Sequence, residues 1–148
     1  MILPATPSFG RRILLSIALL AAAGAVVSSV SLYHHYGTSA TAYCDIGENF
    51  NCDIVNRSTY STVLGVPVAL IGVAGYLAVL ALSTFYRNRR DARALLAIGS
   101  LAGLGFALHL TYVEGFILAT WCILCLSSLA LISSITILSL LLWVRRIP

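Results

Sequence analysis

The sequence has very few charged residues and no lysine. Only 9% of its 148 residues are Asp, Glu, Lys or Arg, whereas 59% are hydrophobic. A soluble domain has roughly 25% charged residues, which it needs to cover a water-facing surface. A soluble globular protein is therefore excluded, and the lipid bilayer is the solvent that fits this composition.

The charges that are present are not arranged for nucleic-acid binding, although the formal net charge is +4. All nine basic residues are arginines, and eight of them lie just outside four long apolar runs. No continuous path of ionisable residues crosses these runs, so a channel or transporter is not indicated. The sequence also lacks internal repeats, low-complexity segments, lipidation motifs and phosphate-binding loops.

Each of the four apolar runs is long enough to cross a bilayer as a helix. Because a helix rises about 1.5 Å per residue, about 20 residues cross a hydrocarbon core of roughly 30 Å. We therefore predict an all-α membrane protein, with four transmembrane helices in one bundle and a single domain over residues 1–148. The predicted helices cover about 12–33, 66–86, 94–118 and 122–143.

Charge and helix number predict the same orientation in the membrane. With four crossings, the N-terminus, the loop between the second and third helices and the C-terminus lie on one side. These three segments carry eight of the nine arginines, and arginine next to a spanning helix usually stays cytoplasmic. We therefore place loop 34–64 outside, with room for a short surface helix over 53–60, and segment 119–121 outside as well. If the first run were a cleaved signal peptide, loop 34–64 would still be external.

All four cysteines lie at or near the predicted external face. Cys44 and Cys52 lie in loop 34–64, and Cys122 and Cys125 form a Cys-x-x-Cys motif where the fourth helix begins. This spacing places the second pair one turn apart on one side of the helix, whose N-terminus favours a thiolate. Since disulfides form outside the cytoplasm, we favour a thiol–disulfide relay. Cys125 is deep enough to meet a lipid-soluble two-electron acceptor, and quinones fit that description.

Two other interpretations of the cysteines stay open. Two structural disulfides would make the chain a non-enzymatic membrane scaffold, although a bridge within one helical turn is strained and exchanges readily. A zinc site or metal carrier would need all four sulfurs at one point, and only one pair has the spacing typical of zinc ligands. We therefore expect no metal.

Two ionisable residues, His109 and Glu114, lie within the third predicted helix, near the level of Cys125. Ionisable residues inside a membrane are candidates for function. We consider His109 as a donor of a proton or hydrogen bond to a quinone, with Tyr112 and Tyr76 on the pocket wall. The alternatives are that His109 bonds a neighbouring helix, that Glu114 reaches interfacial water and that the tyrosines only pack.

The order of these motifs resembles the vitamin K epoxide reductase family in its bacterial or archaeal form. It runs from Cys44 and Cys52 through Ser58 and Gly65-Val66-Pro67 to Cys122-Ile-Leu-Cys125, over nearly the whole chain. The resemblance implies a four-helix bundle around an externally open quinone pocket, in a prokaryotic cell membrane with both termini cytoplasmic. It implies an enzyme that passes electrons from a thioredoxin-like partner to the quinone pool and so supports disulfide formation in exported proteins.

The resemblance also implies a role for each residue of the motif. Cys44 matches the loop cysteine that exchanges with a partner protein, and Cys52 matches the one that passes electrons to Cys122. Cys125 matches the cysteine that faces the quinone. Ser58 matches a loop serine that helps to support the bound state.

Two positions depart from the animal enzymes of this family. Their pocket tyrosine, one turn beyond the second motif cysteine, corresponds to Leu129, and their quinone-binding asparagine corresponds to Val68. These differences argue against vitamin K epoxide as the substrate and leave ubiquinone, menaquinone or a vitamin K type quinone as the acceptor. Some bacterial relatives carry a fused thioredoxin-like domain. None follows the fourth helix here, so we expect the redox partner to be a separate disulfide oxidase.

Overall fold

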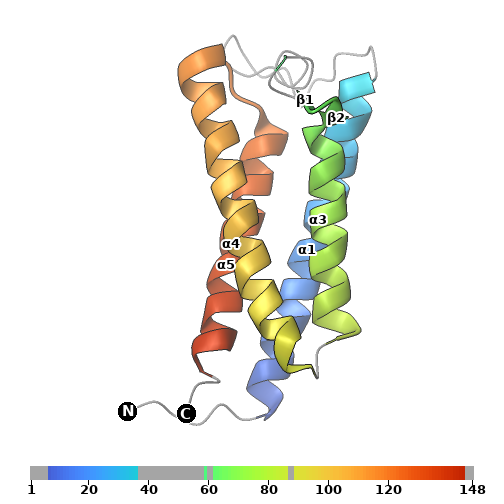
Figure 1. Ribbon diagram of the computed structural model, residues 1–148, viewed down its shortest axis with the longest axis vertical. Helices are drawn as coiled ribbons and strands as arrows, with labels where there is room; N and C mark the ends of the chain where they lie inside the picture. Colours follow the sequence, from blue (N-terminus) through green and yellow to red (C-terminus); the bar gives the residue numbers. More distant parts are fainter. Residues whose placement is uncertain (1–6, 37–58, 60–61, 87–88, 146–148) are drawn as a thin grey trace.

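Four long helices form an elongated bundle in the computed structural model, which describes residues 7–36, 59, 62–86 and 89–145 (Figure 1). The helices are α1 (Pro7–Tyr36), α3 (Val68–Thr84), α4 (Arg90–Tyr112) with its π-helical extension η2 (Val113–Leu118), and α5 (Ile123–Val144). The described part of the chain is therefore mostly helical, in agreement with the helical bundle predicted from the sequence.

Three of these helices are long and apolar enough to cross a bilayer, over Ser8–Tyr33, Asp91–Leu118 and Ile123–Val144. The fourth, α3, is apolar but has 17 residues, which is about the shortest length that spans a hydrocarbon core. Large apolar side chains cover the outside of the bundle, among them Leu19 and Phe116. An apolar surface of this extent suits contact with lipid rather than water.

The helix ends differ from the predicted ranges by a few residues, and the largest difference is a hairpin before α3. Strand β1 (Thr62–Val63) pairs antiparallel with β2 (Val66–Pro67). The turn residues Leu64 and Gly65 both have positive φ, at 53° and 81°, which is the geometry of a two-residue hairpin. Pro67 therefore precedes α3 as its N-cap residue and is not part of the first helical turn.

The main core lies toward the end of the bundle where α1 begins and α5 ends. Ile17 and Ile135 are completely buried there, and Leu96 of α4 packs against them. At the same end, the guanidinium of Arg145 lies 4.3 Å from the centre of the Phe9 ring and ties α5 to α1. This half of the bundle is filled by side chains from all four long helices.

Helices α4 and α5 are also joined by small and polar residues. The Thr136 hydroxyl of α5 donates a hydrogen bond of 3.1 Å to the carbonyl oxygen of Ser100 in α4. Gly103 approaches Ile132 so closely that an added Cβ would lie 3.3 Å from the isoleucine Cδ1. Small residues of this kind allow helices to pack closely in a membrane, and α4 is thereby held against α5 beside the cysteine motif.

Candidate functional site

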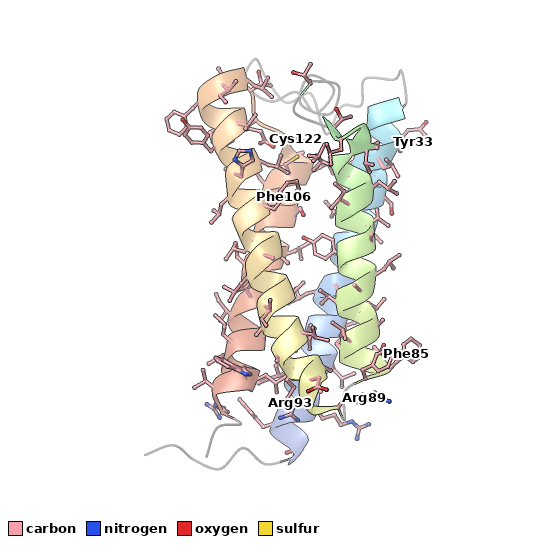
Figure 2. The ribbon with its side chains drawn as sticks, viewed as in Figure 1. Tyr33, Phe85, Arg89, Arg93, Phe106 and Cys122 are labelled. Carbon is pink, nitrogen blue, oxygen red and sulfur yellow. The ribbon has the colours of Figure 1, made fainter. Side chains whose placement is uncertain are left out.

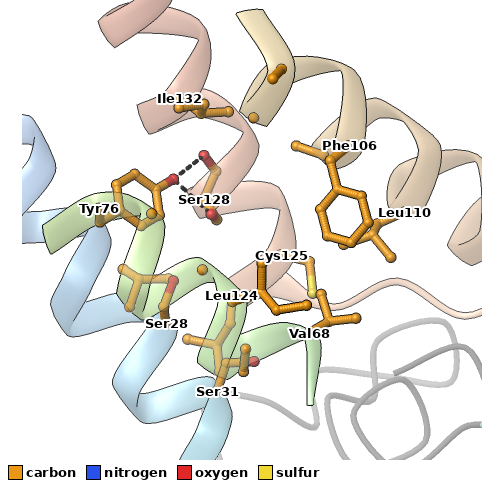
Figure 3. A pocket seen from close by; sticks show the side chains of 18 of the residues that line it. Ser28, Ser31, Val68, Tyr76, Phe106, Leu110, Leu124, Cys125, Ser128 and Ile132 are labelled. Carbon is orange, nitrogen blue, oxygen red and sulfur yellow. Dashed lines mark hydrogen bonds between the residues drawn. The ribbon is translucent and has the colours of Figure 1, made fainter. Parts of the chain in front are cut away.

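A cavity of about 350 Å³ lies between the helices in the half of the bundle that carries the cysteine motif (Figure 3). All four long helices contribute to its wall, which is mostly apolar. The polar side chains on the wall are those of Ser28, Ser31, Tyr76, Glu114, Cys125 and Ser128. A cavity of roughly 300–1,000 Å³ with apolar walls and few polar groups is typical of a binding site for a small organic molecule.

Small residues leave this space open. Gly72 and Gly75 face the cavity from α3, and Gly99 and Ala102 face it from α4. Their side chains are too short to reach across the bundle. In the opposite half, the corresponding space is filled by larger residues such as Leu96 and Ile135.

The link between η2 and α5 is organised by Glu114. Its carbonyl oxygen accepts the N–H of Ala119 and, at 3.0 Å, that of Thr120. Its carboxyl Oε2 accepts the N–H of Cys122 at 3.2 Å. Ala119 adopts the left-handed conformation, with φ of 52°, where the π-helix ends. Since π-helical turns are frequent at functional sites, this irregular end of α4 marks the site independently of the cysteines.

The two motif cysteines differ in their surroundings. Cys122 is the residue that precedes α5, and its exposed fraction is 0% because it packs against Leu118, Ile123 and Leu124. Although the sequence places Cys122 at the external end of its helix, its side chain is enclosed by protein. Cys125, one turn further, is half-buried on the cavity wall, which it shares with Leu124 (Figure 3).

Further along the cavity, a hydrogen-bonded pair joins α3 to α5. The Tyr76 hydroxyl donates to the Ser128 carbonyl oxygen at 2.9 Å and lies 2.7 Å from the Ser128 Oγ (Figure 3). The Tyr76 ring lies close enough to α1 that a Cβ on Gly24 would overlap it. Glycine at this position is therefore what allows the ring to occupy its place in the wall.

Of the residues predicted to bind a quinone, Val68 lines the cavity and three others do not. His109 and Tyr112 are exposed on the outside of α4, where the Tyr112 ring centre lies 5.0 Å from that of Phe116. The cavity face of α4 runs through Phe106 and Leu110. Because each residue turns the helix by about 100°, Tyr112 points away from this face and His109 lies at its edge.

Leu129 is half-buried but does not line the cavity, because its neighbour Ser128 faces the space instead. Ser128 follows Cys125 by three residues and so shares its helix face. This spacing is the signal in the sequence that predicts Ser128 on the same wall as Cys125. The other predicted site residues, Cys44, Cys52 and Ser58, and the surface helix expected over 53–60, lie outside the described residues.

The carboxyl group that was expected to reach interfacial water lies inside the protein. Glu114 has an exposed fraction of 2% and lines the cavity. Its side chain also interacts with that of Cys125. Of the two ionisable residues predicted within the third helix, Glu114 therefore lines the cavity and His109 does not.

Comparison with models of known protein families gives a match over most of the chain. A model described as the vitamin K epoxide reductase family matches residues 15–140, a range that contains all four cysteines and nearly all of the helical bundle. The family is one of membrane thiol–disulfide oxidoreductases. The apolar helices and the Cys-x-x-Cys motif beside a cavity are consistent with such a redox enzyme.

Proposed function

The chain belongs to the vitamin K epoxide reductase family, and we propose that it passes electrons from a reduced thioredoxin-like partner to a quinone. In doing so it would support disulfide formation in exported proteins. The observation that carries this proposal is the position of Cys125, whose side chain lies on the wall of an apolar cavity between membrane helices. A redox-active sulfur in that place is accessible to an acceptor dissolved in lipid.

The cavity suits a quinone ring in shape and in chemistry. A quinone is a flat apolar ring with two carbonyl oxygens, and the wall offers apolar side chains such as Phe106 and Leu110 with a few polar groups. Tyr76 and Ser128 could hold one end of the ring, and Cys125 and Glu114 lie at another part of the wall. Ubiquinone, menaquinone and vitamin K type quinones share the reacting ring and are the candidate acceptors.

The proposed relay begins in the loop and ends at Cys125. A partner thiolate attacks the disulfide between Cys44 and Cys52 at Cys44, which releases Cys52 as a thiolate. Cys52 then attacks Cys122 of the Cys122–Cys125 disulfide, and Cys125 leaves as a thiolate on the cavity wall. The partner's second thiol releases Cys44, which attacks Cys52; this restores the loop disulfide and leaves Cys122 and Cys125 reduced, with the two protons that the partner's thiols gave up. Each exchange requires a thiolate in line with a disulfide. Because Cys122 is completely buried, its exchange with Cys52 takes place in an enclosed position.

We further propose that all four helices cross a prokaryotic cell membrane with the termini in the cytoplasm. Arg89 and Arg93 lie at one end of the bundle and Cys122 lies near the other (Figure 2). Arginine next to spanning helices favours the cytoplasmic side, so the cysteine motif faces outward. A cysteine introduced at Thr62 should then react with a membrane-impermeant maleimide in intact cells, whereas one at Arg89 should react only after lysis.

The competing function is a scaffold stapled by two structural disulfides. Thiol trapping of the purified protein, with and without an added quinone, separates the two. In an oxidoreductase, the number of free thiols that the reagent labels falls when quinone is added. In a scaffold, the disulfides stay unchanged and so does the labelling.

The direct test of the proposal is quinone reduction by the purified protein. Dithiothreitol serves as the electron donor and a short-chain ubiquinone or menaquinone as the acceptor, and quinol formation is followed by absorbance. We expect catalytic turnover that disappears when any of the four cysteines is replaced by alanine. If quinone reduction is no faster with the protein than without it, the proposed function is wrong.

A further inference from the structure

Glu114 is the one carboxyl group among the described residues that line the cavity, and one of its two oxygens has no hydrogen-bond partner among them. Oε2 accepts the N–H of Cys122, whereas Oε1 is buried and has no hydrogen-bond partner within the described structure. A buried carboxyl oxygen without a partner is costly, and more so in a membrane. Such a group calls for an explanation beyond the packing of the turn.

We propose that Glu114 carries protons between the sulfurs of Cys122 and Cys125 and the oxygens of the bound quinone. This inference rests on the proposed function. It assigns a role in the reaction to a residue outside the four cysteines. It also explains the unpartnered Oε1, which is the atom that would take up and release the proton.

The position of the side chain supports this role. Glu114 is almost fully buried and belongs to the same cavity wall as Cys125, with whose side chain it interacts. Its Oε2 is held by the backbone N–H of Cys122, so the carboxyl group lies between the backbone of Cys122 and the side chain of Cys125. A general acid or base must lie within hydrogen-bonding reach of the atoms that gain or lose the proton.

Quinone reduction requires such a group because it moves protons as well as electrons. The thiols of Cys122 and Cys125 together lose two protons and two electrons, and an S–S bond forms between them. The quinone gains both electrons and both protons, and its two C=O groups become C–OH groups. Glu114 accepts one proton from Cys125 and gives it to a ring oxygen, then does the same with the proton from Cys122. The carboxyl group ends in the state in which it began.

No other described side chain is placed to take this role. Besides Glu114, the titratable side chains on the wall are those of Tyr76 and Cys125, and Cys122 lies beside it. The Tyr76 hydroxyl is engaged with Ser128. His109 lies on the outside of α4 and does not line the cavity.

The test compares Glu114→Gln with the unchanged protein. Glutamine keeps an oxygen that accepts the N–H of Cys122, so the turn before α5 is preserved, but it cannot exchange a proton. We expect quinol formation from a short-chain ubiquinone to fall by roughly 10²–10⁴-fold, which is the usual contribution of general acid–base catalysis. A plot of the remaining rate against pH should also lack the inflection that the ionisation of Glu114 gives in the unchanged protein. Glu114→Asp, which keeps the carboxyl group, should restore part of the rate.

A second readout needs no quinone. Infrared difference spectra between the oxidised and the dithiothreitol-reduced protein should contain a carboxyl band that is absent in Glu114→Gln. The matched control is Ser139→Ala, which alters the other buried side-chain oxygen that lacks a partner among the described residues and lies outside the cavity wall. This variant should keep the band, the rate and the pH profile.

The outcomes separate the two proposals. A Glu114→Gln protein with the normal rate and pH profile, or an unchanged protein without a redox-linked carboxyl band, would overturn the role of Glu114. If the unchanged protein reduces no quinone, the proposed function fails. The infrared band still decides whether Glu114 exchanges protons with the sulfurs. If Glu114→Gln does not fold, Glu114→Asp decides by the same two readouts.

Discussion

The two halves of the bundle are built from the same four helices but are packed differently. At the arginine end, Ile17, Leu96 and Ile135 fill the centre with almost no exposed area. At the cysteine end, glycines on α3 and α4 leave a cavity of about 350 Å³. The comparison indicates that the packed half holds the helices together, whereas the other half places the sulfur of Cys125 on the wall of a cavity.

The first prediction concerns the hollow half and has the largest expected effect. Cys125→Ala should reduce dithiol-dependent quinol formation to background, because the sulfur that faces the cavity is the last member of the proposed relay. The matched control is Ser127→Ala on the same helix, whose hydroxyl only donates to the Ile123 carbonyl oxygen and should leave the rate unchanged. Undiminished quinol formation by Cys125→Ala would contradict the assignment.

The second prediction concerns the filled half. Ile17→Ala should lower the free energy of unfolding by about 2–5 kcal/mol, because it leaves a void in a completely buried position. Leu19→Ala on the same helix removes a largely exposed side chain and should change stability by less than about 0.5 kcal/mol. Unfolding in mixed detergent micelles measures both. Equal effects would show that the core contributes no more than the lipid-facing surface.

The third prediction concerns the contact between α1 and the Tyr76 ring, where the packed half of the bundle meets the cavity. Gly24→Ala should lower stability by about 1–3 kcal/mol, because its Cβ would overlap the Tyr76 ring and push it from the wall. The displaced ring should also raise the KM for quinone. Gly105→Ala, whose Cβ would meet no other atom, should be neutral or stabilising by about 0.5–1 kcal/mol. If Gly24→Ala and Gly105→Ala have the same free energy of unfolding, the close approach of α1 to the Tyr76 ring is contradicted.

The smallest effect is expected for Tyr76→Phe. This variant keeps the ring but loses the hydrogen bonds to Ser128, which should cost about 0.5–1.5 kcal/mol of unfolding free energy. Because Tyr76 lies on the cavity wall, the KM for quinone should change more than kcat. Ser83→Ala, which removes a buried hydroxyl that donates to Leu80 at the far end of α3, should leave KM unchanged. A change in kcat alone would indicate that Tyr76 does not contact the acceptor.

Sequence reasoning located the helices well but placed side chains on them poorly. Long apolar runs are a direct signal of membrane helices, so the ranges near 12–33 and 94–118 needed no tertiary information. His109 and Tyr112 were expected at the pocket because of their chemistry, yet both lie outside it. In a helix that is apolar on all sides, the sequence carries no periodic pattern that marks the inner face.

The hairpin and Glu114 show two other limits of the sequence. The β1–β2 hairpin turns at Leu64, a residue with no special tendency to adopt a positive φ, so only Gly65 offered a local signal. Glu114 was recognised as an ionisable residue within a helix, but its burial depends on the π-helical turn and on the approach of Cys122.

The sequence by itself indicated that the protein lies in a lipid bilayer, and it determined the number of apolar runs, the family and the Cys122–Cys125 spacing. These properties depend on composition and on residues close together in the chain. The tertiary structure decided which half of the bundle is hollow, that Cys122 is enclosed while Cys125 faces the cavity, and that Glu114 contacts both. These properties arise where helices from distant parts of the chain meet, and the rotation of each helix about its axis is set by packing.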